Sequence, residues 1–433
     1  MEEMQISNIG ISLFEEQIVR TFFISDNFSL LKRLSKQNQV YIFTNQNIGK
    51  FLTTKFFELN IQNVQVLIIH NYRENFTLKL LYSFFRWSDP STGTLRNLFR
   101  ERNSRRMNLF GFWFRLIFYR LMSHFKILKI FCRKLLVLSF STRNFESQMS
   151  IHIPKLRVFF STALTNTESD LPLSIYFSKK GAQVVSTLRS WDNLVTKGTL
   201  KFQPDVFISH SKYMTDLALN IHAINPVSII EGTTPSYQVK FLPRPKKLSN
   251  RKRKISYGCI GPILNPDEIH FIEWLGQIST KIDVEITVVQ HPKFLHDLRN
   301  IETGNLVFMK FDYLSSSLTD YYMHLSKQDL IIASGTSFAL DTLFVNTPFI
   351  ALCFEIIGQD YWLSHLRSYD LVPHSRFLFD NLDIKKVYDK ENLIEILERP
   401  NATKLPNSKL SNLQEITGDT SIEFNDLIVS ILT

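Results

Sequence analysis

The segment from Arg189 to Asn193 (RSWDN), with Lys197-Gly198 shortly after it, is an unusual concentration of ionisable and hydrogen-bonding side chains. It follows an apolar run, 182–187, of the kind that forms a buried strand. A carboxylate at such a strand exit can accept a proton from an attacking hydroxyl, so Asp192 is the best candidate for a general base. The alternative is a structural cluster in which Trp191 anchors the interior and the polar residues form a turn. Because packing does not require so many polar groups there, we favour a functional site.

A second candidate site is the loop Ser334-Gly335-Thr336-Ser337, which contains three hydroxyls and a glycine. It follows the apolar run 330–333 and precedes apolar residues at helical spacing, 338–344, after which 349–354 is typical of a second buried strand. This order predicts a βαβ unit whose helix start presents backbone N–H groups to a ligand, and those groups suit a phosphate. The alternative is that the hydroxyls only cap the helix.

Other polar residues stand where predicted strands end, which is the ligand-facing edge of a parallel sheet. They are Asp26 after 20–25, His210 after 206–209, Gly261 after 255–260 and His291 after 284–289. A lone histidine more often has a structural role, and a helix cap explains Asp26 equally well. We nevertheless include all four as candidates, because the strand ends of one sheet converge.

The composition narrows the class of protein. With 433 residues, 44% of them hydrophobic, the chain is long enough for two domains with sizeable cores and is not a disordered protein. Its three cysteines and eleven histidines show no disulfide or metal-ligand spacing, so we expect a reducing cytosol and no metal site. The acidic start, MEEM, lacks the apolar segment of a signal peptide.

These sites need parallel sheets to bring them together. Strands and helices alternate at a spacing that predicts an α/β fold with crossover connections. A basic segment with two prolines, 243–254, is typical of a linker, so we expect a first domain at 1–242 and a second at 255–433. The expected strands of the first domain are 20–25, 40–44, 64–69, 156–161, 182–187, 206–209 and 228–231. Those of the second are 255–260, 284–289, 306–310, 330–333 and 349–354.

A basic insert at about 78–150 interrupts the first domain. From Arg96 to Arg143 the chain carries twelve lysines and arginines against one acid, Glu101, among many apolar residues. A narrow arc of a helix carries Arg115, Lys126, Lys129 and Arg133. No uncharged apolar run approaches the ~20 residues of a spanning helix, so we expect a basic amphipathic insert that binds an anionic membrane surface. The alternatives are nucleic acid, which needs fewer aliphatic residues, and helices packed on the sheet with a solvated basic face.

The RSWDN…KG string resembles the SWDN…KG signature of bacterial surface-polysaccharide glycosyltransferases, which are distantly similar to CDP-glycerol glycerophosphotransferases and UDP-N-acetylglucosamine 2-epimerases. In the second half, Gln290-His291-Pro292 resembles the HP element of that wider group, and Ser334 to Ser337 with Asp341 resembles its phosphate and ribose element. The usual residue at the last position is Glu, which is one methylene longer. The resemblance runs from about Arg20 to Glu355 and is poor over the insert. It implies two facing Rossmann-like domains of the GT-B type.

The resemblance further implies transfer of a sugar or polyol phosphate from a nucleotide-activated donor to a lipid-linked or growing surface polysaccharide, of capsule or O-antigen type. Asp192 and His291 would be the catalytic residues. The donor site would comprise Gly261, His291, Ser334, Gly335, Thr336, Ser337 and Asp341. The acceptor side would comprise Asp26, Arg189, Ser190, Trp191, Asn193, Lys197 and His210. The sequence has no Asp-x-Asp pattern, so we expect backbone groups and His291, rather than a metal, to balance the diphosphate charge.

We expect this enzyme to be cytoplasmic and peripheral on the inner membrane face, with no cofactor and no nucleic-acid partner. One alternative is a nucleotide-sugar 2-epimerase, which needs neither a membrane nor an acceptor. Another is a non-catalytic GT-B-like scaffold in polysaccharide assembly, because 14 glycines leave few tight phosphate loops.

Overall fold

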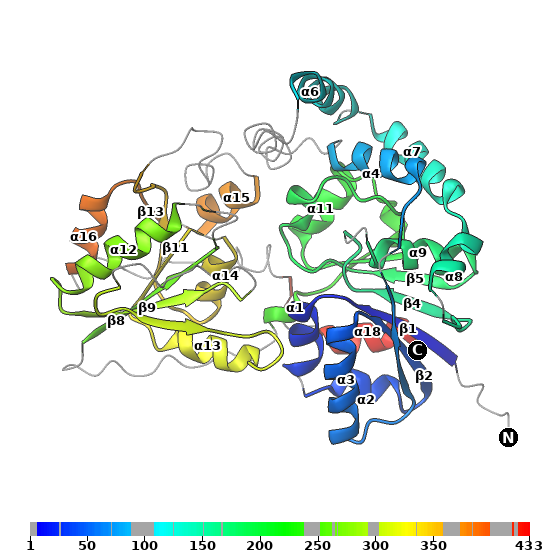
Figure 1. The fold of residues 1–433 in the computed structure, drawn as a ribbon, viewed down its shortest axis with the longest axis horizontal. Coiled ribbons are helices and arrows are strands. Elements are labelled where there is room, and N and C mark those ends of the chain that lie inside the picture. Colours follow the sequence, from blue (N-terminus) through cyan, green and yellow to red (C-terminus); the bar gives the residue numbers. More distant parts are fainter. Residues whose placement is uncertain are drawn as a thin grey trace. The chain divides into compact units, whose positions relative to one another are not determined.

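The chain folds into two compact units, Met1–Gln238 with Gln414–Thr433 (unit 1) and Val239–Leu413 (unit 2). Figure 1 shows each unit as a sheet with helices packed against it. The computed structural model describes residues 7–25, 27–70, 72–87, 108–123, 125–149, 151–165, 168–237, 252–261, 265, 267–292, 303–334, 336–357, 373–382, 384–398, 418–419 and 423–433.

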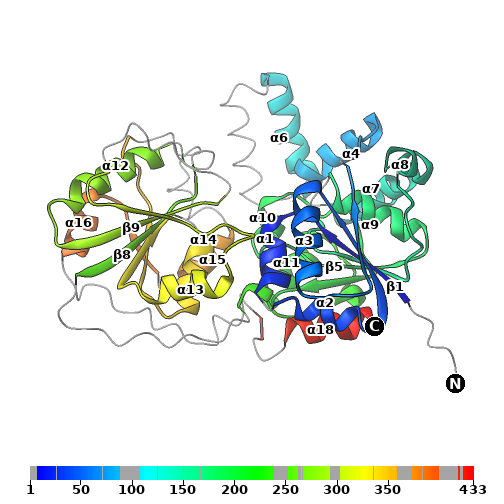
Figure 2. The same ribbon diagram turned by 60° about the horizontal axis from the view of Figure 1, so that its bottom comes forward.

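Unit 1 contains a seven-stranded sheet in the order β3-β2-β1-β4-β5-β6-β7, and all its neighbouring strands pair in parallel. The strands are β1 (Ser7–Leu13), β2 (Asn38–Thr44), β3 (Val64–Ile68), β4 (Val158–Ser161), β5 (Gln183–Ser186), β6 (Val206–Ser209) and β7 (Ile229–Glu231). The connecting helices include α2 (Ser29–Leu34), α3 (Gln46–Glu58), α9 (Asp170–Lys179) and α11 (Lys212–Asn220). Helices lie against both sides of the sheet (Figure 2). The prediction of a parallel α/β domain is confirmed.

The first predicted strand, 20–25, is wrong. The chain there forms a helix, α1 (Glu16–Val19), that continues as a π-helical stretch, η1 (Arg20–Ile24). Buried residues at 18, 19, 22 and 23 follow helical spacing, and within the short window 20–25 two adjacent phenylalanines imitate a strand. The true first strand is β1, whose serines, asparagine and glycine concealed a central position between β2 and β4. Asp26 therefore does not follow a strand, and it lies outside the described residues.

The described residues between β3 and β4 include the helices α4 (Phe76–Trp87), α6 (Leu109–Ser123), α7 (Lys126–Ser139) and α8 (Thr142–Met149). Helices α4, α6 and α7 pack on one another, for example through the rings of Phe84 and Phe118, whose centroids are 5.1 Å apart. None of the described helices combines the length and apolar character needed to cross a bilayer.

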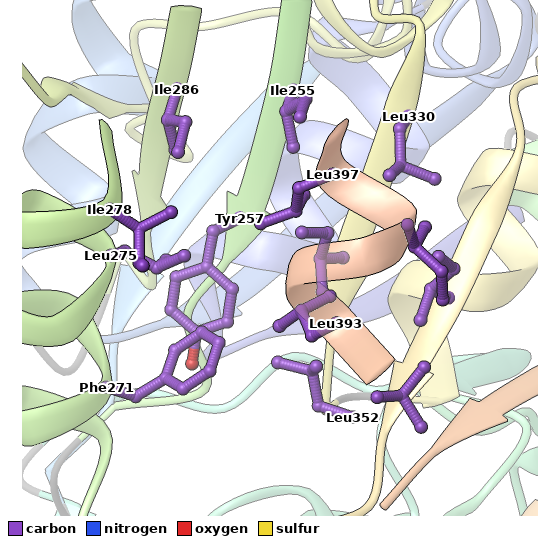
Figure 3. Packing of buried hydrophobic residues seen from close by; sticks show 14 of the residues in the cluster. Ile255, Tyr257, Phe271, Leu275, Ile278, Ile286, Leu330, Leu352, Leu393 and Leu397 are labelled. Carbon is purple, nitrogen blue, oxygen red and sulfur yellow. The ribbon is translucent and has the colours of Figure 1, made fainter. Parts of the chain in front are cut away.

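Unit 2 contains a six-stranded parallel sheet in the order β10-β9-β8-β11-β12-β13. The strands are β8 (Arg253–Gly258), β9 (Val284–Gln290), β10 (Val307–Lys310), β11 (Leu330–Ala333), β12 (Phe349–Leu352) and β13 (Lys385–Val387). The helices are α12 (Glu268–Ser279), α13 (Leu318–Ser326), α14 (Thr336–Phe344), α15 (Pro373–Leu382) and α16 (Lys390–Glu398). Figure 3 shows the core on one face of this sheet, where the Tyr257 ring lies 4.9 Å from that of Phe271 and the same cluster includes Ile286 and Leu393. Neither β13 nor α15 was expected.

The C-terminal segment corrects the expected second domain, 255–433, because Gln414–Thr433 belongs to unit 1. Helix α18 (Phe424–Leu432) buries Phe424, Ile428 and Leu432, which lie on one helix face. The Phe424 ring lies 5.0 Å from that of Phe22, and Arg33 forms an ion pair with Asp426 at 2.6 Å. The apolar face of α18 thus packs against the core of unit 1.

Candidate functional site

In unit 1, parallel pairing brings the carboxyl ends of β5 and β6 side by side at one edge of the sheet. The RSWDN string begins three residues after β5, and His210 directly follows β6. The structure therefore brings these predicted residues together. Asp192 is half-buried and immediately precedes α10 (Asn193–Thr196), where its Oδ2 accepts a hydrogen bond from Thr196 Oγ1 at 3.3 Å.

Asn193 and Trp191 point to different roles within this string. The Asn193 side chain is 1% exposed, and within the described ranges neither its Oδ1 nor its Nδ2 has a hydrogen-bond partner. Burying an amide without a partner costs about 1–3 kcal/mol, and the described surroundings of Asn193 do not offset that cost. Trp191 is buried with its ring 6.2 Å from that of Tyr213, which is the interior-anchor arrangement. Ser190 is half-buried, and its carbonyl accepts a hydrogen bond from Asn193 N at 3.1 Å.

Arg189 forms an ion pair with Glu15, a residue that the sequence analysis missed. Glu15 follows β1, and β4 lies between β1 and β5 in the sheet. The pair therefore links two strand exits across a third. The missed strand β1 explains the omission, because Glu15 could have been recognised only as the residue after it.

His210 is buried at the exits of β5 and β6. Its Nε2 lies 2.9 Å from Thr187 Oγ1, and Thr187 Oγ1 also donates to Ile208 O at 3.0 Å. Burial lowers the pKa of His210 to about 4, so the ring is neutral near pH 7. With 1% of its surface exposed, the imidazole positions the two strand exits and has little area to offer a substrate.

Asp170 is a second residue that the sequence analysis did not select. It lies fully buried in the first turn of α9, where its Oδ1 accepts a hydrogen bond from Ser12 Oγ in β1. Burial raises the pKa of Asp170 to about 7, and the nearby Glu15 carboxylate adds to the rise, while the Ser12 hydrogen bond opposes it. A carboxyl group that titrates near neutral pH at the strand exits is suited to proton exchange.

Lys197 and Gly198 complete the predicted string but belong to a packing contact. Gly198 has φ +77°, and a Cβ there would lie 2.7 Å from Arg86 Cα in α4. The next residue, Thr199, donates its N–H to Phe85 O at 2.9 Å. The glycine is therefore needed for the backbone to approach α4. The Lys197 side chain is exposed.

Two of the four cations expected to face a membrane are instead buried. The Lys129 and Arg133 side chains are 1% and 4% exposed. Lys129 Nζ donates to Ile221 O at 2.8 Å, and the Arg133 guanidinium donates to the carbonyls of Leu200, His222 and Ala223. Three of these four carbonyls lie just after α11, where the helix dipole favours cations. The predicted arc on one helix is wrong, because Arg115 lies on α6 whereas Lys126, Lys129 and Arg133 lie on α7. Arg115 is half-buried and Lys126 is exposed.

In unit 2, the loop after β8 is fixed by Glu268, which is buried at the start of α12. Its carboxylate accepts the N–H groups of Ile260 at 2.9 Å and Gly261 at 2.8 Å, as well as the Tyr257 hydroxyl at 2.8 Å. Gly261 adopts φ +92°, which a glycine tolerates. The Gly261 N–H, which could otherwise bind a phosphate, is thus engaged by Glu268. Gly261 shapes the loop and leaves anion binding to other groups.

The predicted phosphate loop follows β11, next to β8 in the sheet. Ser334 is buried, and its hydroxyl has no hydrogen-bond partner among the described residues. Helix α14 begins at Thr336, so its first N–H groups are available at the same edge. Gly335 and the side chains of Thr336 and Ser337 lie outside the described residues.

Asp341, the predicted ribose ligand, faces α13. Its Oδ2 accepts a hydrogen bond from the Tyr321 hydroxyl at 2.8 Å, and Tyr322 contributes a longer one to Oδ1 at 3.5 Å. The side chain remains half-exposed. An ionised carboxylate has about four acceptor positions, so these tyrosines orient Asp341 without saturating it.

The same edge of unit 2 carries two acceptors that the sequence analysis missed, Asn265 and Glu355. Asn265 Oδ1 and both carboxylate oxygens of Glu355 are buried and have no hydrogen-bond partner among the described residues. His291 is half-buried after β9, so the exits of four neighbouring strands, β9, β8, β11 and β12, all carry polar groups. Glu355 could have been found from its place after the apolar run 349–354. Within the described ranges, no three His, Cys, Asp or Glu side chains form a metal-ligand group.

Comparison with known proteins gives the fold. No protein-family model matches the chain, and no curated protein sequence matches it. Among solved structures, the S. aureus MnaA–UDP co-structure superposes with a TM-score of 0.51 at 9% identity, covering 98% of this chain and 95% of that one. The glycotransferase of kitacinnamycin gives 0.50 at 9% identity over 99% and 100% of the two chains. This is the GT-B type of fold, with two Rossmann-like domains.

A UDP-GlcNAc 2-epimerase from Methanocaldococcus jannaschii, solved with UDP-GlcNAc and UDP, gives a TM-score of 0.49 at 14% identity. The aligned region covers 98% of this chain and 99% of the epimerase. The fold assignment rests on the two structures above it.

Proposed function

We propose that the protein is a metal-independent glycosyltransferase of the GT-B type. It would move a sugar or polyol phosphate from a nucleotide-activated donor to a lipid-linked or growing surface polysaccharide at the inner leaflet. Solved structures with this fold include a glycotransferase and a protein bound to UDP, which supports a nucleotide-activated donor.

The observation that carries the proposal is a set of buried polar groups, at the ligand edge of each sheet, that have no hydrogen-bond partner among the described residues. Asn193 has this property in unit 1, and Asn265 and Glu355 have it in unit 2. Buried polar groups in folded proteins are otherwise almost always hydrogen-bonded. Both edges therefore fit ligands rich in hydroxyl groups, and a transferase needs two such ligands.

Unit 2 is the donor side of the proposal. The N–H groups at the start of α14 would bind the diphosphate, assisted by Ser334 to Ser337. Asp341, which Tyr321 holds in place, would accept a hydrogen bond from a ribose hydroxyl. Glu355 would accept a hydrogen bond from a hydroxyl of the transferred group. His291 would stand beside the diphosphate.

Unit 1 is the acceptor side, with Asp192 as the general base. The acceptor hydroxyl would lose its proton to the Asp192 carboxylate while its oxygen bonds to the anomeric carbon, or to phosphorus for a polyol phosphate. The bond from that atom to the nucleotide phosphate breaks, and the nucleotide leaves with the electron pair. The Arg189–Glu15 pair and Asn193 would hold the acceptor against Asp192.

The helices between β3 and β4 support the membrane location, but two of the four cations first expected to bind the membrane cannot do so. Lys129 and Arg133 are internal, so Arg115 and Lys126 are the remaining cations of the original four. A lipid-linked acceptor is presented at the membrane surface, where a peripheral enzyme can reach it.

A thermal-shift series with UDP, CDP, GDP and their sugar or polyol derivatives tests the donor part. A ligand that binds only the native state raises the free energy of unfolding by mass action, and with it the melting temperature. At a ligand concentration 100 times Kd the gain in free energy is roughly 2.7 kcal/mol. We expect one nucleotide family to shift the parent and the Asp192→Asn variant equally. No shift with any of them would contradict the proposal and favour the scaffold alternative.

A further inference from the structure

Helix α7 turns two of its charged side chains toward the interior of unit 1 and exposes a face of large apolar side chains. Its cations Lys129 and Arg133 face inward, together with Cys132 and Leu136. The opposite face carries Ile127, 83% exposed, along with Ile130, Phe131 and Leu138, which are also exposed. A helix that simply packed on a domain would present these faces the other way round.

Helices α4 and α6 extend this exposed apolar face. The two helices pack on α7 and on each other, and Figures 1 and 2 show all three together on unit 1. We call the exposed large apolar residues of the three helices, together with Phe125 at the start of α7, the apolar surface. Its members are Phe76, Leu80, Leu109, Phe110, Trp113, Phe114, Ile117, Phe125, Ile127, Ile130, Phe131 and Leu138. Twelve such side chains far exceed the scattered exposed residues of an ordinary soluble surface.

The charge around this surface favours lipid over protein as the occupant. Helices α4, α6 and α7 contain no Asp or Glu. Lys126 and Lys134 are exposed on the same side of α7 as Ile127 and Ile130, an arrangement that complements anionic headgroups. Trp113 and the phenylalanines are typical of the bilayer interface. Lysine is depleted from protein interfaces, which makes a protein partner the weaker fit.

The buried cations explain how the reversed helix is held. Lys129 and Arg133 make four hydrogen bonds to main-chain carbonyls, and the three carbonyls of 221–223 and that of Leu200 would otherwise lack these donors. Turning α7 over would place both charges in solvent and strip those carbonyls of their partners. The anchor therefore fixes the apolar face outward.

We propose that the apolar surface of α4, α6 and α7 inserts into the headgroup region of an anionic bilayer, with Lys126 and Lys134 at its rim. The inserted helices lie in the plane of the interface. This inference rests on the membrane location in the proposed function and specifies which residues bind the bilayer. It uses none of the proposed chemistry, so the test below can fail while the transfer reaction stands.

The experiment is co-sedimentation of the full-length protein with phosphatidylcholine vesicles, with and without phosphatidylglycerol, at low and high salt. We expect binding to both kinds of vesicle, stronger with the anionic lipid. The Lys126→Gln/Lys134→Gln variant should lose about fivefold in affinity per lysine on anionic vesicles. The part of the binding that comes from insertion should persist at high salt, because apolar contact is not screened.

The deciding variant is Ile127→Glu/Phe131→Glu, which changes the exposed face opposite the anchor. It should keep the parent's melting temperature and lose vesicle binding. The control is Phe57→Glu, a phenylalanine on α3 that is even more exposed than Phe131, and this variant should bind like the parent. As a test that needs no charged variant, parent fluorescence should shift to the blue on vesicles, and Trp113→Phe should reduce that shift.

Three outcomes would overturn the inference. One is a parent that binds no vesicles, and another is a double variant that binds as well as the parent. The third is a parent dimer that ignores vesicles and dissociates in the double variant, because the apolar surface is then a protein interface.

Discussion

The carboxylate of Glu15 and the guanidinium of Arg189 form an ion pair that joins the exits of β1 and β5 across β4. Both side chains are largely shielded, at 18% and 23% exposure. Asp170 lies close enough for Glu15 to raise its pKa. One cation and two carboxyl groups therefore share the edge of the sheet where the RSWDN string begins.

Replacing Glu15 by Gln should reduce transfer activity and lower the free energy of unfolding by about 1–3 kcal/mol, since the largely shielded Arg189 guanidinium loses its charged partner. Arg189→Gln should have the same effect on activity, and the double variant should be no worse than either single one. Activity and urea unfolding of the four proteins form the cycle, with Glu16→Gln as a neighbouring control. Additive losses in activity would show that the two residues act separately.

Asp170 predicts a pH dependence of stability. Burial holds its pKa near 7 in the folded state, above the ordinary aspartate value that the unfolded chain retains. Between those values the folded state binds more protons, so its contribution is present at low pH and is lost as pH rises through about 7. Asp170→Asn should remove this loss, on the order of 4 kcal/mol between pH 4 and pH 8. Urea unfolding across that range checks it, and parallel pH profiles for parent and variant would contradict it.

Much of the fold was predictable because its strands are buried on both faces. Runs such as 206–209 and 330–333 are continuous and apolar, and their bounds matched the structure. Strand β1 was missed because Ser, Asn and Gly occupy its first half, and only pairing with two neighbours identifies it as central. The return of the tail helix α18 to unit 1 depends on long-range packing that no local pattern encodes.

The candidate site was predictable where it followed a recognised strand. The RSWDN string and His210 were predicted because each follows a recognised strand. Glu15 was not predicted because the strand before it, β1, was not recognised. Helical periodicity grouped Lys129 with Arg133, but it gave no information about which side of the helix met the protein. The direction depended on the carbonyls of 221–223, which are distant in sequence.

Arg133→Leu should lower the stability of unit 1 by about 2–4 kcal/mol, because the three main-chain carbonyls that Arg133 bonds lose their partner. Lys134→Leu makes the same chemical change one residue later on the exposed side, and it should cost less than about 0.5 kcal/mol. Urea unfolding measures both variants. Equal effects would mean that the arginine is not an internal anchor.

Glu355→Gln should weaken donor binding by roughly tenfold, since a hydrogen bond between a ligand and a charged group contributes about 1.5–3 kcal/mol. The same change should leave the melting temperature unaltered or raise it, because the carboxylate has no described partner to lose. Calorimetry with the nucleotide derivative found in the thermal-shift series gives the affinity. The exposed Glu391→Gln in α16 serves as control, and a destabilised Glu355→Gln with full affinity would assign the carboxylate to the fold.

The central claim is transfer, and mass spectrometry of the products tests it most directly. Protein, the donor that binds and a membrane lipid extract should yield an acceptor heavier by one sugar or polyol phosphate, with one nucleotide released per transfer. Asp192→Asn should bind the donor normally and turn over about 10²–10⁴-fold more slowly. A sugar that changes configuration with no acceptor present would contradict transfer and identify an epimerase, and full turnover in Asp192→Asn would exclude that carboxylate as the base.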